Sequence, residues 1–425
     1  MCQRGLTMRA FEEIPSARDR VSDPHVPRSA RFPSFVGMPA NTHERFDALV
    51  VAVVGAGSVG RQILIHLAKL MIARIFIVDP GQVQATNFLT HPGLTPGEDL
   101  GASKARIAGE LVKCISPRTR VLVCDSALEE LSPVALADAS VVFLATDNLS
   151  VEVEAGRRAL LLGQKLIQGS VHGPTNIAQV RFFSNADGTQ CPCPACAYSR
   201  EEWNAHAAQT RFSCAGGRIS DAAASDSMGP TTSCSFLCSL AADLVVNQAI
   251  KHILQLGPAP DDTLLEYAGY RNTTSIAPLR FNGSCPVDHA SCSRHPCPKS
   301  DLCECSLAEL SRAAGLCPAT DDTAFTVGDD FRYVETAICN CGMIVDVAQF
   351  VSDSEQLSSR CMCGGALSAI PYYVHRPAPM PVVRKQFETP LRQLGAGKAT
   401  WAMIRQGKRA GLVLQNPDRR EDVLS

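Results

Sequence analysis

The sequence predicts an α/β protein whose main domain is a doubly wound, mostly parallel sheet, followed by a small Cys-rich domain. Continuous apolar runs such as LVVAVV at 49–54 are typical of parallel strands, which are buried on both faces. These runs alternate with helical stretches, as they do in doubly wound sheets. From about residue 284 the composition shifts to Cys, Pro, Ser and Asp, which indicates a second domain.

The predicted elements keep that alternation along the chain. The strand at 49–54 ends in a glycine-rich turn that opens a helix, and the next apolar strand ends at Asp79. Strands and helices then alternate as far as one long apolar helix, which we expect to be buried in the core. Further strands are predicted at 73–78, 120–124, 141–146 and 165–170, and helices at 59–71, 103–115, 151–162 and 233–256.

Composition divides the chain into four parts. Residues 1–45 are rich in Pro, Arg and Ser and show no period, so we expect a partly disordered N-terminal arm. The main domain occupies 46–284, and the Cys-rich region 285–376 follows it. A Pro-rich joint, RPAPMPVVR, leads into a last segment at 377–425.

Charge and hydropathy exclude several classes of function. The 425 residues include 40 Lys and Arg against 42 Asp and Glu, so no global basic field would hold a nucleic acid. The longest apolar runs fall far short of the ~18 residues that a membrane span needs. The N-terminus mixes charges of both signs without an apolar run, unlike a signal peptide. We therefore expect a cytoplasmic protein that binds neither nucleic acid nor membrane.

A glycine-rich loop predicts a nucleotide site. Gly55, Gly57 and Gly60 lie in GAGSVG, after a strand and at the start of a helix. Glycines there allow backbone N–H groups to approach phosphate, and the helix N-terminus adds a positive dipole. Asp79 ends the next strand, where it would meet a ribose hydroxyl. These parts alone would also suit NAD, and an NAD oxidoreductase is one interpretation.

Three further segments carry a resemblance to a known superfamily. They read DPGQVQATNFLTH at 79–91, GASKARIAGELVKCISP at 101–117 and VVFLATDNLSVE at 141–152. Together they resemble the ubiquitin-activating enzymes and their bacterial relatives, the ThiF-type and molybdopterin-synthase adenylyltransferases, over roughly residues 28–285. The resemblance implies a Rossmann-like ThiF-type fold. It also implies an enzyme that makes a carboxyl adenylate from ATP and the C-terminus of a small β-grasp protein.

That chemistry brings two anions together, so charge must be neutralised around the α-phosphate. By resemblance, Lys104 would touch the phosphates and Asp147 would hold Mg²⁺. Asn87 would bridge phosphate and the pocket floor, and Asp79 would hold the ribose. Taken singly, Lys104 could be a surface lysine and Asp147 a turn former.

Two positions depart from the family pattern. Thr90 replaces the family arginine, with His91 following, and Gly81 replaces an acid. Arg61, beside the glycine loop, could supply the missing charge, although a solvated arginine at a helix start is an equal alternative. Relatives donate an arginine from a partner's arm. Arg28 and Arg31 are the candidates for that role in a homodimer, against an ordinary basic arm.

The 19 cysteines are clustered, and short spacings in a reducing compartment favour metal. Cys193 and Cys196 form a C-x-x-C knuckle, which relatives pair with a second knuckle to hold structural Zn²⁺. In this sequence, the segment that would hold the second knuckle reads SCPVDHASC and contains no C-x-x-C. Cys285 with His289, or Cys285 with Cys292, would complete the set.

A second zinc set is predicted from two C-x-C pairs, each followed by glycine. The pairs are Cys339 with Cys341 and Cys361 with Cys363, at a separation similar to that of zinc ribbons. A third group of donors could form another site or supply alternative ligands: His295, Cys297, Cys303 and Cys305.

Cys214 is the candidate nucleophile. Its surroundings, RFSCAGGRISD, look like the S/T-C-A-x-x-G sequence of the ThiF type. A neighbouring cation, Arg218, could lower the pKa of the thiol and favour the attacking thiolate. The alternative is a spare thiol with no catalytic role.

We therefore predict ATP-dependent activation of a ubiquitin-like protein, followed by a thioester and transfer to a conjugating enzyme. An adenylation domain with a zinc-ribbon-like tail resembles the activating enzymes of bacterial ubiquitin-like conjugation systems. One alternative is a sulfur-carrier adenylyltransferase that serves cofactor biosynthesis. Another is an interaction module that keeps the ThiF fold without catalysis.

Overall fold

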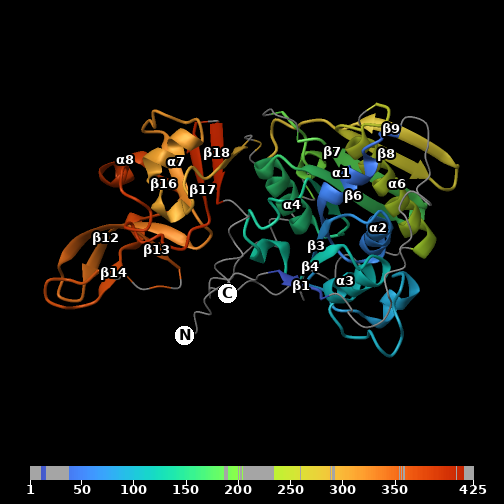
Figure 1. Ribbon diagram of the computed structural model, residues 1–425, viewed down its shortest axis with the longest axis horizontal. Helices are drawn as coiled ribbons and strands as arrows, with labels where there is room; N and C mark the ends of the chain where they lie inside the picture. Colours follow the sequence, from blue (N-terminus) through green and yellow to red (C-terminus); the bar gives the residue numbers. More distant parts are fainter. Residues whose placement is uncertain are drawn as a thin grey trace. The chain divides into compact units, whose positions relative to one another are not determined.

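A computed structural model of the chain shows two compact units (Figure 1). The first unit ends at His289 and the second begins at residue 290. The structure describes the following residues: 11–15, 38–185, 190–199, 201, 203, 234–258, 260–287, 289, 292–353, 355, 357, 359–407 and 409–415.

The first unit is built on a nine-stranded sheet with the order β1-β4-β3-β2-β5-β6-β7-β8-β9. The five strands from β4 to β6 are parallel, which confirms the predicted fold class. β1 pairs antiparallel at one edge, and β7, β8 and β9 form an antiparallel extension at the other. The strands are β1 (Glu12–Glu13), β2 (Val50–Val54), β3 (Arg74–Val78), β4 (Arg120–Cys124), β5 (Val141–Leu144), β6 (Lys165–His172), β7 (Ile177–Phe183), β8 (Thr263–Ala268) and β9 (Thr273–Pro278).

Helices cover both faces of this sheet, as a doubly wound fold requires. Alternate strand residues divide between two cores: Val51 and Val53 face one, whereas Ala52 and Val54 face the other. Residues of α2, α3 and α6 complete the first core, and residues of α4 contribute to the second. The helices are α1 (Thr42–Ala48), α2 (Ser58–Lys69), α3 (Lys104–Ile115), α4 (Leu149–Leu162) and α6 (Ser235–Leu254).

Three helices begin at the edge where the parallel strands end. Ser103 caps α3 by accepting the Arg106 N–H, and Asn148 caps α4 by accepting the N–H groups of Ser150 and Val151. α2 starts immediately after Gly57, in the glycine loop. The N-terminal turns of these helices therefore lie at the carboxyl edge of the sheet, where a doubly wound fold binds its ligand.

The long helix α6 is the one described helix that is long and apolar enough to cross a membrane, by length and composition only. Half of its apolar window is buried inside the protein. Its buried residues, including Leu237, Ala241 and Val245, belong to the first core of the sheet. This arrangement is that of a core helix, as the sequence predicts.

The second unit contains two further sheets. One has the order β10-β18-β17-β11-β16, and the other has the order β13-β12-β14, with β15 also paired to β12. Short helices, including α7 and α8, accompany them. The elements are β10 (Cys292–Pro296), α7 (Leu307–Ala313), β11 (Thr323–Val327), β12 (Phe331–Cys339), β13 (Ile344–Ser352), β14 (Leu367–Ala369), β15 (Val374–His375), β16 (Ala378–Pro379), α8 (Met380–Val383), β17 (Trp401–Gln406) and β18 (Arg409–Leu414).

The division of the chain differs from the predicted one in two places. The first unit extends to His289, beyond the expected end at 284, because Cys285 and His289 lie against Cys193 and Cys196. The last segment, expected to be separate at 377–425, supplies β17 and β18, which pair with β11 and β10. From residue 290 onward, the Cys-rich region and the last segment are therefore one unit.

Candidate nucleotide pocket and metal clusters

The glycine loop connects β2 to α2 at a place where only glycine fits. Gly55 has a φ of 95° and its N–H donates to the Val78 carbonyl at 2.8 Å. A Cβ on Gly55 would lie 2.3 Å from the Ala145 oxygen, and one on Gly60 would lie 1.9 Å from the Gly55 oxygen. A Cβ on Gly57, in contrast, would meet only His91 Nε2 within 4 Å among the described residues, at 3.8 Å. The loop therefore leaves space above Gly57 in which a phosphate would fit.

Asp79 ties this loop to the end of β3. One carboxylate oxygen accepts the Ala56 N–H at 2.6 Å, and the other accepts the Gly81 N–H at 2.7 Å. The residue is buried, with 9% exposure. An ionised carboxylate has about four lone-pair sites, so Asp79 retains capacity for ribose hydroxyls, the role predicted for it.

Lys104 begins α3 beside Asp79 and Gly81. Its backbone N–H donates to the Gly81 carbonyl at 2.9 Å. A Cβ on Gly81 would lie 3.2 Å from Lys104 Cδ and 2.8 Å from Asp79 Oδ1. The glycine that departs from the family pattern therefore makes room for the lysine side chain at the strand ends.

Arg61 is buried in the first turn of α2, which excludes the alternative of a solvated arginine. Its Nε donates to the Pro92 carbonyl at 2.9 Å and its Nη2 donates to the Gly93 carbonyl at 3.3 Å. Nη1 is buried without a hydrogen-bond partner among the described residues. Burial lowers the pKa of Arg61, yet a guanidinium stays charged at neutral pH. A buried positive charge with a free donor suits an anion nearby.

Two further residues predicted to bind the nucleotide, Asn87 and Asp147, lie in segments that connect strands to α-helices. Asn87 lies inside the 3₁₀ turn Ala85–Leu89, where its Oδ1 accepts the N–H of the N-cap residue Gln84 at 2.9 Å. Its side-chain nitrogen is thus the group that could reach a ligand. Asp147 is exposed in the loop between β5 and α4, at the same edge of the sheet as the glycine loop.

Four predicted residues lie outside the described part of the chain. They are Arg28 and Arg31 of the N-terminal arm, Cys214, and its neighbour Arg218. Their roles stay predictions.

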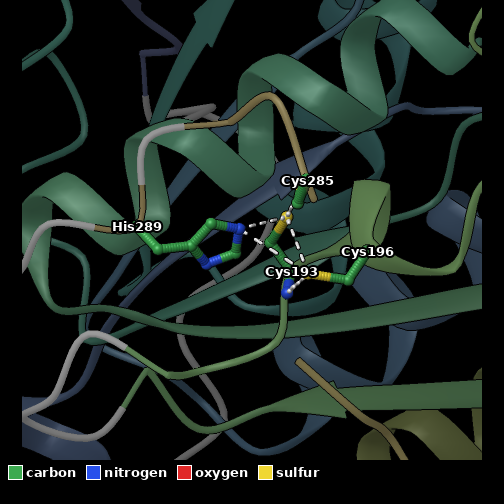
Figure 2. Close-up of side chains that lie close together, drawn as sticks. All are labelled: Cys193, Cys196, Cys285 and His289. Atoms are coloured by element: carbon green, nitrogen blue, oxygen red, sulfur yellow. Dashed lines mark hydrogen bonds between the residues drawn. The ribbon is translucent and has the colours of Figure 1, made fainter. Parts of the chain in front are cut away.

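The first metal cluster brings Cys193, Cys196, Cys285 and His289 together, with all donor atoms within 4.8 Å of one another (Figure 2). His289 Nε2 lies 3.5 Å from Cys193 Sγ and 3.6 Å from Cys196 Sγ, and Cys193 and Cys285 are 3.9 Å apart at sulfur. Of the two predicted completions, the structure brings in His289. Cys292 instead begins β10 in the second unit.

Neighbouring groups favour the protonation states that metal ligands need in this cluster. His289 Nδ1 lies 2.8 Å from the Cys191 carbonyl, so Nδ1 carries the proton and Nε2 turns its lone pair to the sulfurs. The hydrogen bond from Cys193 lowers the pKa of the Cys196 thiol to about 5, which favours a thiolate. Three cysteines and one histidine at this spacing match a structural Zn²⁺ site.

The second metal cluster joins Cys339 and Cys341 to Cys361 and Cys363, again with donor atoms within 4.8 Å. A hydrogen bond from the Met343 N–H lowers the pKa of Cys341 to about 7. A Cβ on Gly365 would lie 2.8 Å from Cys339 Sγ, so this position requires glycine. The four-sulfur set fits Zn²⁺ as well.

The third group of predicted donors does not form such a cluster among the described residues. Cys297 and Cys305 are 3.6 Å apart at sulfur, whereas the Cys303 thiol donates to the Ala399 carbonyl. His295 Nε2 lies 2.7 Å from Ser293 Oγ. Cys303 and Cys305 are part of the core of the second unit.

Sequence reasoning assigned no role to His91, which the structure places beside Gly57. Its Nδ1 lies 3.0 Å from Ser58 Oγ and 3.1 Å from Thr90 Oγ1. The only signal in the sequence was its position after Thr90, at the departure from the family pattern.

Comparison with known proteins gives a family and several relatives for the first unit. The sequence model of the ThiF family matches residues 29–287. A sulfur carrier protein adenylyltransferase from Thermus thermophilus is 26% identical over 250 residues, which cover 57% of this chain and 83% of that protein. A SAMP-activating enzyme E1 from Haloferax volcanii is 24% identical over 243 residues, covering 56% of this chain and 79% of that protein. The family match ends before the second unit.

Among solved structures, the chain is similar to E. coli MccB. The crystal structure of MccB with ATP is 15% identical, with a TM-score of 0.45, and the match covers 58% of this chain and 68% of that one.

Proposed function

Because this chain belongs to the ThiF family, we propose that it uses ATP to adenylate the C-terminal carboxylate of a small ubiquitin-like protein. One observation carries the proposal. At a single edge of the sheet, the glycine loop and Asp79 share a hydrogen bond, and both Asp79 and the side chain of Lys104 lie beside Gly81. The names of the relatives, an adenylyltransferase and an activating enzyme, support the same reaction class.

In this reaction a carboxylate oxygen attacks the α-phosphorus of ATP and the bond to the bridging oxygen breaks, so that pyrophosphate leaves. The N–H groups of the glycine loop and the cations Lys104 and Arg61 would stabilise the negative charge of the phosphates. Asp147 would hold Mg²⁺, which supplies further positive charge and prefers oxygen ligands.

Two continuations follow from the adenylate, and we propose the first. In it, the Cys214 thiolate attacks the acyl carbon of the adenylate, AMP leaves, and the thioester is passed to a conjugating enzyme that the second unit recruits. The second unit lies beyond the family match, which suits an added docking role. In the alternative, the small protein is a sulfur carrier, as the name of the Thermus relative suggests. A homodimer that shares Arg28 or Arg31, and a cytoplasmic location, belong to the same proposal.

The adenylation step is tested by ATP–pyrophosphate exchange with a panel of ubiquitin-like and sulfur-carrier proteins. Asp147→Ala is expected to raise the Mg²⁺ concentration for half-maximal exchange by about tenfold or more, because a metal ligand is lost. The matched control is Asp138→Ala, since Asp138 pairs with Arg74 at 3.3 Å and precedes β5 at the opposite edge of the sheet. An unchanged Mg²⁺ dependence in Asp147→Ala would remove this residue from the site. No exchange by the wild-type protein would leave a ThiF-fold interaction module.

The covalent step is tested with Cys214→Ala. Incubation of the wild-type protein with the small protein, ATP and Mg²⁺ is expected to give an adduct that a thiol reductant releases. The variant is expected to lose this adduct and to keep pyrophosphate exchange, because the adenylate forms before any thiol attacks. Gel electrophoresis with and without reductant measures the adduct. Normal downstream transfer by the variant would show that Cys214 is a spare thiol.

A further inference from the structure

The imidazole of His91 has one partnered and one unpartnered nitrogen. Nδ1 lies close to the hydroxyls of Ser58 and Thr90, at 3.0 and 3.1 Å. Nε2 is buried and has no hydrogen-bond partner among the described residues. The same Nε2 is the atom that a Cβ on Gly57 would meet, at 3.8 Å. The free nitrogen therefore lies at the space above the glycine loop.

The electrostatics of this place keep the ring neutral. Burial first, and then the nearby charges of Lys104 and Arg61, lower the pKa of His91 to about 4. A neutral imidazole carries one N–H, and its position depends on what the other nitrogen bonds. The hydroxyls of Ser58 and Thr90 can each donate to Nδ1 or accept from it. In the tautomer in which Nδ1 accepts, the proton lies on Nε2.

We propose that His91 contacts the nucleotide directly, by donating its Nε2–H to a phosphate oxygen bound over the glycine loop. The inference rests on the proposed function and adds a residue to it. A buried N–H without a partner is costly, and a phosphate oxygen would satisfy it. A neutral donor also suits a place near the charges of Lys104 and Arg61, where a third cation would be repelled.

The two hydroxyls would act through His91, as positioning residues. By donating to Nδ1, Thr90 Oγ1 and Ser58 Oγ would fix the plane of the ring and keep the proton on Nε2. Thr90 thus has a role at the position where the resemblance expects an arginine: it orients the donor that follows it.

Equilibrium binding of ATP and of adenosine to the full-length protein tests this inference. His91→Ala is expected to raise the Kd for ATP by about ten- to hundredfold, the effect of losing a hydrogen bond to a charged group. Its affinity for adenosine, which has no phosphate, is expected to stay unchanged. His91→Gln keeps a side-chain N–H and is expected to recover part of the ATP affinity. His66→Ala is the matched control. His66 lies in the last turn of α2, away from the glycine loop, and pairs with Asp243 of α6.

Three outcomes would overturn the inference. They are an unchanged Kd for ATP in His91→Ala, an equal loss of affinity for ATP and adenosine, and no better ATP binding by His91→Gln than by His91→Ala. In each of them the wild-type protein still binds ATP, so the proposed function stands. A wild-type protein that binds no ATP would overturn the proposed function and this inference with it.

Discussion

Replacing Lys104 with alanine is expected to lower the rate of ATP–pyrophosphate exchange by about 10²–10³-fold, the usual cost of removing one donor to developing charge. The side chain packs over Gly81 next to Asp79, at the edge where the parallel strands end. Its loss would leave the phosphates with Arg61, whose Nε and Nη2 already hold the carbonyls of Pro92 and Gly93. Exchange of labelled pyrophosphate into ATP measures the effect.

The control for Lys104 lies on the same helix. Lys113 is in the last turn of α3, where its Nζ donates to the Pro117 carbonyl at 3.2 Å. Lys113→Ala is expected to exchange pyrophosphate at the wild-type rate, and circular dichroism should show both variants folded. Equal rates for the two variants would mean that Lys104 does not contact the phosphates.

Removal of metal is expected to give the largest change in stability. Structural Zn²⁺ contributes about 10–16 kcal/mol in small zinc-binding peptides, comparable to the whole stability of a domain at about 5–15 kcal/mol. The tip of the β12–β13 hairpin has only a small core, formed by Ala337, Cys339, Cys361 and Leu367. A chelator is therefore expected to abolish protection from hydrogen exchange at this tip. Elemental analysis should find about two Zn²⁺ per chain.

Variants separate the two clusters. Cys361→Ser should lose one Zn²⁺ and the protection of residues 336–369, whereas Cys193→Ser should lose the other Zn²⁺ and leave this hairpin intact. Cys317→Ser is the control, because Cys317 is exposed and outside both clusters. Less than one Zn²⁺ in the wild-type protein would contradict the ligand sets.

The centre of the fold could be predicted because local rules determine it. A buried apolar run such as Val50–Val54, followed by glycines, has few alternatives to a parallel strand that turns into a helix. The antiparallel strands β7 to β9 gave no comparable signal. β9 (Thr273–Pro278) is exposed along its whole length, so its pairing with β8 leaves no hydrophobic period in the sequence.

The sequence predicted which side chains belong to the candidate sites better than it predicted how they are arranged in space. Spacing alone left Cys292 as an alternative to His289 in the first cluster, because it does not show where the chain turns. Arg61 shows the same limit. Its burial depends on carbonyls 31 and 32 positions away, at Pro92 and Gly93, which no local pattern connects to it.

The first metal cluster also determines the connectivity of the chain. Cys193 and Cys285 are 92 positions apart, so a metal held between them closes a long loop in the covalent path. Closing a loop of about 100 residues costs about 4–5 kcal/mol of chain entropy, which the folded structure offsets by holding the two ends together. The cluster would thus join the two ends of the segment that carries Cys214 and α6. Because such a site rarely exists in an unfolded chain, this join stabilises the protein only while the folded state holds the metal.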